Sequence, residues 1–236
     1  MIDTVSRTGS TNGDLSASLK AGERIAEGHW LVADRQTAGR GRQGREWFDG
    51  LGNFMGSTVV HLQAGDPSPP TLALLAGLAT YQAVLPHCPD PLPLRLKWPN
   101  DLMFAAAKLA GILLERAGDS VIVGIGVNLA AAPQVPGRDT IALAKFGPAP
   151  DRDMFACSIA GIFAGELQRW RTYGTQPLIN RWESAAHPKG TPLTVNEQTD
   201  GIISGVFDGL LPDGSLRLRL ADGTWRAIHA GDVMLA

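Results

Sequence analysis

The sequence predicts an α/β domain followed by a small β-barrel, and three observations support this fold class. The chain has 236 residues, of which 44% are hydrophobic and 19% charged, which suits a large soluble domain with a small one attached. Runs with the length and spacing of helices and strands are interspersed up to about residue 188. Short β-like runs separated by Asp-Gly pairs then follow. We therefore expect one domain at residues 1–188 and another at residues 189–236.

The first half of the larger domain is expected to contain two helices and two strands. Ser10, Thr11 and Asn12 are good N-terminal caps, so a helix is predicted over residues 13–26. The other elements predicted here are a short buried strand at 30–33, a Val- and Thr-rich strand at 54–62, and a buried helix at 72–85 that is apolar almost all round.

The second half of this domain is expected to contain a β-hairpin between other strands and two helices. Two apolar runs, at 108–115 and 121–129, are separated by a short turn, which predicts an antiparallel pair. The other expected elements are a strand at 94–98, a turn at 99–101, a short run at 102–105, a loop over 130–150, and helices at 151–173 and 176–185.

The C-terminal residues are expected to form the barrel. Five short β-like runs lie at 193–195, 202–207, 216–220, 225–228 and 233–235. An Asp-Gly pair between apolar runs is a strong turn signal, and such pairs begin at Asp200, Asp208, Asp213 and Asp222. Several short strands in so short a segment are typical of a small β-barrel.

Composition excludes several classes of protein. The formal net charge is -2, so no global positive field favours a nucleic-acid partner. Two cysteines cannot form a disulfide framework, which suits the reducing cytoplasm. The N-terminus lacks the pattern of a signal peptide, and the longest apolar run is too short to span a membrane. A cytoplasmic protein that binds neither DNA nor membrane is therefore predicted.

The most unusual stretch is a loop at residues 36–48, called here the Gly/Arg loop. Its glycines let the backbone approach a ligand, and its arginines offer forked donors that match phosphate or carboxylate oxygens. Trp47 adds a flat face on which a base could stack. A solvated basic loop is the competing interpretation, and this stretch by itself favours neither.

The same loop contains a literal G-x-G-x-x-G pattern at Gly39, Gly41 and Gly44. In a dinucleotide-binding fold this pattern opens directly into an apolar helix. Here the residues between and after the glycines are mostly arginines, and no amphipathic helix follows. We therefore reject a dinucleotide-binding turn.

Polar residues elsewhere suit a reaction governed by positive charge. No Ser-His-Asp triad, P-loop or zinc cluster is present in the sequence. Lys97, Asp101 and Lys108 suit the attack of a carboxylate on an α-phosphate, because cations and Mg²⁺ bring the two anions together. Asp101 is then a candidate Mg²⁺ ligand. Taken singly, Asn100-Asp101 could be only a turn and Lys108 only an edge charge.

Four ordered motifs resemble those of the biotin protein ligases. They are QTAGRGRQGREW at 36–47, KWPNDL at 97–102, KLAGILLE at 108–115 and GIGVNL at 124–129. The resemblance implies a mixed-sheet α/β catalytic domain of the class II synthetase-like biotin/lipoate ligase type, followed by an SH3-like barrel. It also implies two steps. The carboxylate of biotin attacks the α-phosphate of ATP to give biotinyl-5′-AMP and pyrophosphate, and a lysine of a biotin carboxyl carrier protein then displaces AMP.

The resemblance also assigns roles to residues. The ureido ring of biotin would contact Ser10, Thr11, Asn12 and Gln36. The loop over biotin and its carboxylate would include Gly39 and Arg40, with close backbone approach at Gly111, Gly124 and Gly126. The nucleotide would be bound by Arg42, Arg45, Trp47, Lys97, Asn100, Asp101 and Asn128, with Asp101 on the Mg²⁺ side. The catalytic residues would be Arg42 and Lys108, and Lys108 would reach both the reacting carboxylate and the phosphate.

Finally, the resemblance implies which substrates and partners the protein has, and it leaves two alternative functions open. The substrates would be biotin and ATP with Mg²⁺, the macromolecular partner a biotin carboxyl carrier domain, and no organic cofactor would be tightly bound. Some members carry an N-terminal winged-helix domain and repress transcription. Only nine residues precede Ser10, so we expect a stand-alone enzyme, monomeric or homodimeric. A lipoate or octanoate protein ligase and a non-catalytic biotin-responsive regulator are the alternatives.

Overall fold

A seven-stranded mixed sheet organises the larger part of the chain, and the computed structural model describes residues 1–197 and 201–235. The strand order is β1-β2-β3-β7-β6-β5-β4, with β1 and β2 parallel and the other neighbours antiparallel. This arrangement confirms the predicted fold class. The strands are β1 (Ile2–Val5), β2 (Trp30–Ala33), β3 (Phe54–His61), β4 (Leu94–Lys97), β5 (Asp101–Phe104), β6 (Ala107–Ala117) and β7 (Ser120–Val127).

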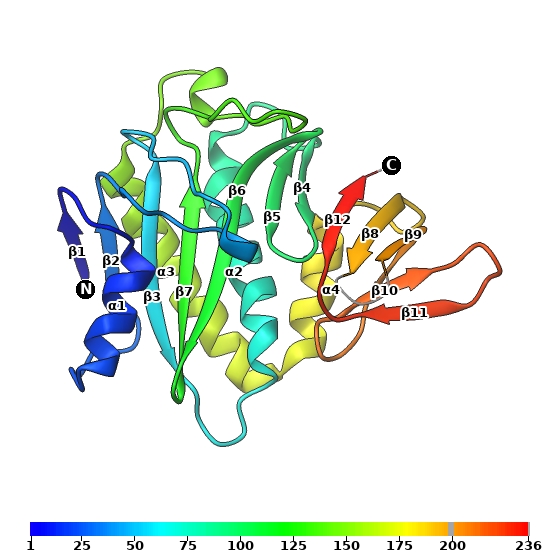
Figure 1. Cartoon of the computed structure of the whole chain (residues 1–236), viewed down its shortest axis with the longest axis horizontal. Coiled ribbons are helices and arrows are strands. Elements are labelled where there is room, and N and C mark those ends of the chain that lie inside the picture. The colour runs from blue at the N-terminus through cyan, green and yellow to red at the C-terminus, as the bar shows by residue number, and fades with distance from the viewer. Residues whose placement is uncertain (198–200, 236) are drawn as a thin grey trace.

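Helices cover the two faces of this sheet unequally (Figure 1). The neighbours Val59 and Val60 on β3 point to opposite faces, since side chains alternate along a strand. Val60 belongs to the main core, whereas Val59 packs with Leu15 of α1 and Ile122 of β7. The main core is covered by α2 (Leu72–Val84), α3 (Arg152–Tyr173) and α4 (Thr175–Ala185), and the other face by α1 (Thr11–Lys20). The face that carries only α1 has room for a ligand pocket.

The C-terminal strands form a separate antiparallel sheet in the order β11-β10-β9-β8-β12. Its core is continuous with the main core: the rings of Trp182 and Phe207 lie 6.4 Å apart. Trp98 Nε1 also donates to the carbonyl of Gly214 at 3.0 Å. These contacts attach the second sheet to the larger domain. The five strands are β8 (Pro192–Glu197), β9 (Gly201–Leu210), β10 (Leu216–Arg219), β11 (Trp225–Ile228) and β12 (Asp232–Leu235).

Most predicted elements are confirmed, but the N-terminal region differs. The first helix begins at Thr11 because Ser10 is its N-cap, and it ends at Lys20 rather than at residue 26. Gly22 follows with φ +82, a left-handed conformation that breaks the helix. The strand β1 was not predicted; it is a short edge strand whose side chains are all partly or fully exposed, so it has no apolar pattern.

The barrel region holds a second difference. The Asp208-Gly209 pair was predicted to be a turn but lies inside β9, where Gly209 has φ +106. The pairing register between β9 and β10 shifts at this point, so the pair forms an irregularity in the strand. The predicted turn at Asp200 lies outside the described residues. The boundary between residues 188 and 189 stays a prediction. No helix in the described residues is long and apolar enough to cross a membrane.

Candidate active site

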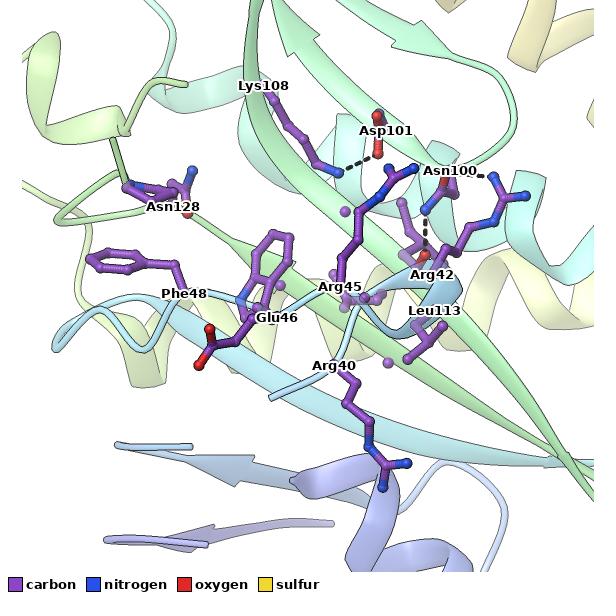
Figure 2. A pocket seen from close by; sticks show the side chains of 18 of the residues that line it. Arg40, Arg42, Arg45, Glu46, Phe48, Asn100, Asp101, Lys108, Leu113 and Asn128 are labelled. Carbon is purple, nitrogen blue, oxygen red and sulfur yellow. Dashed lines mark hydrogen bonds and ion pairs between the residues drawn. The ribbon is translucent and has the colours of Figure 1, made fainter. Parts of the chain in front are cut away.

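A pocket of about 830 Å³ lies on the sheet face that carries α1 (Figure 2). Its lining comes from the start of α1, the Gly/Arg loop, the strands β3, β6 and β7, the turn before β5, the loop at 133–140 and β12. Every predicted site residue except Gly39 lines this pocket. Gly39 is buried beneath it, where its carbonyl accepts from the amide of Trp47 at 2.9 Å.

One end of the pocket is uncharged, and we call it the polar floor: Thr11, Asn12, Gln36 and Ser57. These side chains are only 1% to 7% exposed. Gln36 Oε1 accepts from the amide of Thr11 at 2.8 Å, and the hydroxyls of Thr11 and Ser57 are 2.7 Å apart. Ser57 in turn donates to Asn12 Oδ1 at 2.6 Å. Four buried polar groups therefore hold one another in place.

Ser10 lies beside the polar floor and has a structural task. Its hydroxyl accepts from the amide of Gly13 at 3.4 Å, in the position of a helix N-cap. The cap fixes the first turn of α1, which carries Thr11 and Asn12. Capping and pocket lining are therefore combined in Ser10.

The polar floor suits a ring that carries both a carbonyl and N–H groups. A backbone amide can only donate, so the Thr11 contact fixes Gln36 with Oε1 inward and leaves its Nε2 donors for a ligand. The hydroxyls of Thr11 and Ser57 each keep lone-pair capacity. A ureido group offers one acceptor and two donors, which matches this set. An apolar ring would leave these buried groups without partners, which costs binding energy.

The middle of the pocket is a strip of glycines on β6 and β7. A Cβ at Gly126 would lie 2.3 Å from ring atoms of Trp47, and one at Gly111 would lie 2.9 Å from the same ring. A Cβ at Gly124 would lie 2.3 Å from Asn12 Oδ1. The glycines were predicted to admit a ligand or another backbone; here the space beside them is occupied by side chains. Trp47 thus lies flat against the strip.

Two lysines and a carboxylate form the opposite end. Asp101 lies between Lys108, whose Nζ is 2.5 Å from Oδ1, and Lys97, whose Nζ is 3.5 Å from Oδ2. Burial alone would raise the pKa of the Asp101 carboxyl, but the ammonium groups of Lys108 and Lys97 hold it below its ordinary value. Burial lowers the pKa of Lys97. The carboxylate thus orients both lysines, and Figure 2 shows its contact with Lys108.

Two arginines of the Gly/Arg loop complete this cationic wall, which we define as Arg42, Arg45, Lys97 and Lys108. Arg42 donates to Asn100 Oδ1 at 3.2 Å, and burial lowers its pKa. Arg45 pairs with Asp232 of β12, so the barrel contributes to the pocket.

The third arginine of the loop points elsewhere. Figure 2 shows Arg40 directed away from Lys108 and Asp101, toward the α1 side. A Cβ at Gly13 of α1 would lie 3.4 Å from the Arg40 guanidinium. Arg40 therefore lies nearer the polar floor than the cationic wall.

The predicted Mg²⁺ ligand is engaged by other groups. Both carboxylate oxygens of Asp101 face lysine ammonium groups, so a metal ion would have to displace one of them. The described residues contain no cluster of three or more His, Cys, Asp or Glu side chains that could hold a metal. Asp101 in this arrangement does not fit a direct Mg²⁺ ligand, and that assignment stays a prediction.

Comparison with known proteins shows the family of this chain. The sequence profile of the "Biotin/lipoate A/B protein ligase family" matches residues 7–129. The chain belongs to this family. It is 37% identical over 226 residues to a biotin--[acetyl-CoA-carboxylase] ligase of Paracoccus denitrificans, covering 91% of this chain and 92% of the relative. It is 32% identical to the ligase of the same name from Mycobacterium tuberculosis, covering 99% and 88%.

A solved structure agrees with this family membership. The biotin protein ligase from Aquifex aeolicus in complex with biotin and ATP matches with a TM-score of 0.87 and 25% sequence identity. The match covers 100% of this chain and 99% of that chain.

Within this family fold, the pocket contains residues that sequence analysis did not assign. Ser57 lies in the middle of an apolar strand and carries no sequence signal. Asp232 and Arg138 come from the barrel and from a loop, far along the chain from the motifs. Glu115 does not line the pocket but accepts a hydrogen bond from Asn12, which does; it is the last residue of one ligase-like motif and was given no role. Asn128 keeps a buried Oδ1 without a hydrogen-bond partner, while its Nδ2 donates to the carbonyl of Ile141.

Proposed function

We propose that this protein activates biotin with ATP as biotinyl-5′-AMP and transfers the biotinyl group to a lysine of a biotin carboxyl carrier protein. The observation that carries the proposal is one pocket with a ureido-complementary polar floor at one end and a cationic wall at the other. A glycine strip covered by Trp47 joins the two ends.

Biotin occupies the end next to α1. Its ureido oxygen accepts from Gln36 Nε2, and its ring N–H groups donate toward the hydroxyls of the polar floor. The apolar body and valeryl chain run along the glycine strip toward Lys108. The carboxylate then lies near an ammonium group that Asp101 already orients, and Arg40 is placed to cover the biotin end.

The nucleotide occupies the cationic wall. Arg42, Arg45 and Lys97 take the phosphates, Trp47 packs near the adenine, and Asn128 offers its unpaired acceptor. In the first step a carboxylate oxygen of biotin forms a bond to the α-phosphorus, and the bond from that phosphorus to the pyrophosphate oxygen breaks. Lys108 and Arg42 stabilise the negative charge that accumulates there, in a site already arranged to receive it.

In the second step the carrier protein reacts with the biotinyl-5′-AMP formed in the first. The uncharged amine of its lysine attacks the carbonyl of the mixed anhydride, the bond to AMP breaks, and an amide remains. Mg²⁺, which ordinarily accompanies the phosphates of ATP, would neutralise phosphate charge when bound; the protein's own contribution is the cationic wall. A cytoplasmic location, and a monomer or homodimer that does not bind DNA, complete the proposal.

The test is mass spectrometry of a biotin carboxyl carrier domain incubated with this protein, biotin and MgATP. We expect a mass gain of one biotinyl group on one lysine and release of AMP. Pyrophosphate exchange into ATP should require biotin, and lipoate or octanoate should not replace it. Exchange supported by lipoate would favour the lipoyl or octanoyl alternative. Biotin binding without AMP release would favour the non-catalytic regulator.

A further inference from the structure

Glu115 of β6 ends the chain of hydrogen bonds that forms the polar floor. Its Oε2 accepts from Asn12 Nδ2 at 2.7 Å, and Asn12 is only 4% exposed. Among the described residues no ion pair to Glu115 is present, so the contact to Asn12 is directional rather than ionic. The hydrogen bonds run from Glu115 through Asn12, Ser57 and Thr11.

The direction of every bond in this chain follows from Glu115. A carboxylate accepts hydrogen bonds and does not donate them, so the Asn12 amide must turn Nδ2 toward Glu115 and Oδ1 toward Ser57. Ser57 then donates its single hydroxyl proton to Asn12 Oδ1. The shorter contact of the Thr11 hydroxyl, at 2.7 Å to Ser57, then uses the proton of Thr11, for which Gln36 Oε1 at 3.2 Å is the other acceptor.

This ordering decides what the floor offers a ligand. The hydroxyls of Thr11 and Ser57 have no proton left, so toward the pocket they can only accept. Gln36 Nε2 can only donate, because its Oε1 is held by the amide of Thr11. A ring with two N–H donors and one carbonyl fits this pattern, whereas a ring with donors only lacks an acceptor for Gln36.

We propose that Glu115 is a positioning residue that sets the direction of the hydrogen bonds in the polar floor, so that its hydroxyls prefer a ring with N–H groups over an analogue without them. The inference rests on the proposed function, since that function supplies the ureido ligand. Without Glu115 the Asn12 amide can turn over, the chain can run in either direction, and the preference should weaken.

Calorimetric binding separates this inference from catalysis. The probes are biotin and its cyclic carbonate analogue, in which ring oxygens replace both N–H groups and would face the acceptor-only hydroxyls of Thr11 and Ser57. In Glu115→Leu we expect biotin to bind roughly 5- to 10-fold more weakly, the effect of one lost partner for a buried amide. The ratio of the two affinities should fall by a similar factor, while ATP affinity should stay unchanged.

Two further variants give the controls. Glu115→Gln keeps a hydrogen bond to Asn12, but its amide can donate as well as accept, so it should bind biotin better than Glu115→Leu does while still losing part of the preference. Arg116→Leu changes the next residue of the same strand, whose side chain faces the other side and donates to the Gly118 carbonyl, and it should change neither affinity. If Glu115→Leu does not fold, Ser57→Ala breaks the same chain at the next link and should lower the preference likewise.

Two outcomes would overturn the inference. One is an unchanged ratio of biotin to cyclic carbonate affinity in folded Glu115→Leu or in Ser57→Ala. The other is an equal loss of biotin and ATP affinity, which would indicate general distortion. The proposed function fails separately, if the wild-type protein binds biotin but shows no biotin-dependent pyrophosphate exchange.

Discussion

The two ends of the pocket recognise ligands by different physics. The side chains of the polar floor are 1% to 7% exposed, uncharged and bonded to one another. In the cationic wall the basic side chains of Lys97, Lys108 and Arg45 are 17%, 21% and 41% exposed and form ion pairs with carboxylates. Buried neutral hydrogen bonds distinguish ligands by the positions of their donors and acceptors. Charged side chains attract any group of opposite charge, and salt screens this attraction. The floor should therefore set specificity and the wall should drive the reaction.

The largest expected effect comes from removing one charge of the wall. Lys108→Ala should lower the adenylation rate about 10²–10³-fold, or about 2.7–4 kcal/mol, the loss typical of one preorganised donor to developing charge. Biotin affinity measured by calorimetry should fall much less than the rate, because the polar floor is intact and only the contact to the biotin carboxylate is lost. Lys20→Ala, at the exposed end of α1, is the matched control. An unchanged rate of pyrophosphate exchange would remove Lys108 from the mechanism.

A second change tests the strip that joins the two ends. In Gly126→Ala the new Cβ would lie 2.3 Å from Trp47, so the indole must move. Overpacking of this kind costs about 1–3 kcal/mol, and we expect roughly tenfold slower adenylation. Gly165→Ala on α3 is the control, since nothing lies within 4 Å of its Cβ position and alanine favours a helix. Equal adenylation rates in Gly126→Ala and Gly165→Ala would show that adenylation does not depend on the position of the Trp47 indole.

A third prediction concerns acid stability next to the wall. Burial, together with the charges of Lys97 and Arg95, lowers the pKa of His187 from 6.5 to about 4. A lowered folded-state pKa means that protons bind the unfolded chain more tightly. The contribution of His187 is thus fully present above pH 6.5 and is lost as the pH falls toward about 4.

Urea unfolding of the wild type and of His187→Gln across this pH range measures that contribution. The free energy of unfolding should fall more steeply with acid in the wild type than in the variant. Parallel curves would show that folding does not lower the pKa of His187.

The smallest effect is expected at the contact between loop and barrel. The partners Arg45 and Asp232 are 41% and 28% exposed, and such surface pairs contribute about 0–1 kcal/mol to stability. Asp232→Asn should therefore leave unfolding nearly unchanged but raise ATP affinity at low salt, because Arg45 loses a competing carboxylate. The gain should vanish near 1 M salt, where charges are screened within about 3 Å. Asp208→Asn, which breaks a pair with Arg217 elsewhere in the barrel, should show no such gain.

Much of the fold was predictable because its signals are local. The apolar helix α2, the N-cap Asp151 of α3 and the hairpin of β6 and β7 each follow from neighbouring residues. The edge strand β1 was missed because its side chains have no buried face. The turn predicted at Asp208-Gly209 was wrong because this dipeptide is compatible both with a turn and with an irregularity inside a strand.

For the site, the sequence by itself determined the candidates: the Gly/Arg loop, Lys97, Lys108 and the strand glycines lie in ordered motifs with distinctive chemistry. Only the tertiary structure decided their partners. It placed Trp47 over the glycine strip, put Arg40 on the α1 side and engaged Asp101 with two lysines. The Gly/Arg loop also meets the barrel. The physical reason is that a motif fixes residue types along the chain, whereas hydrogen-bond direction and charge pairing depend on groups brought together from distant strands.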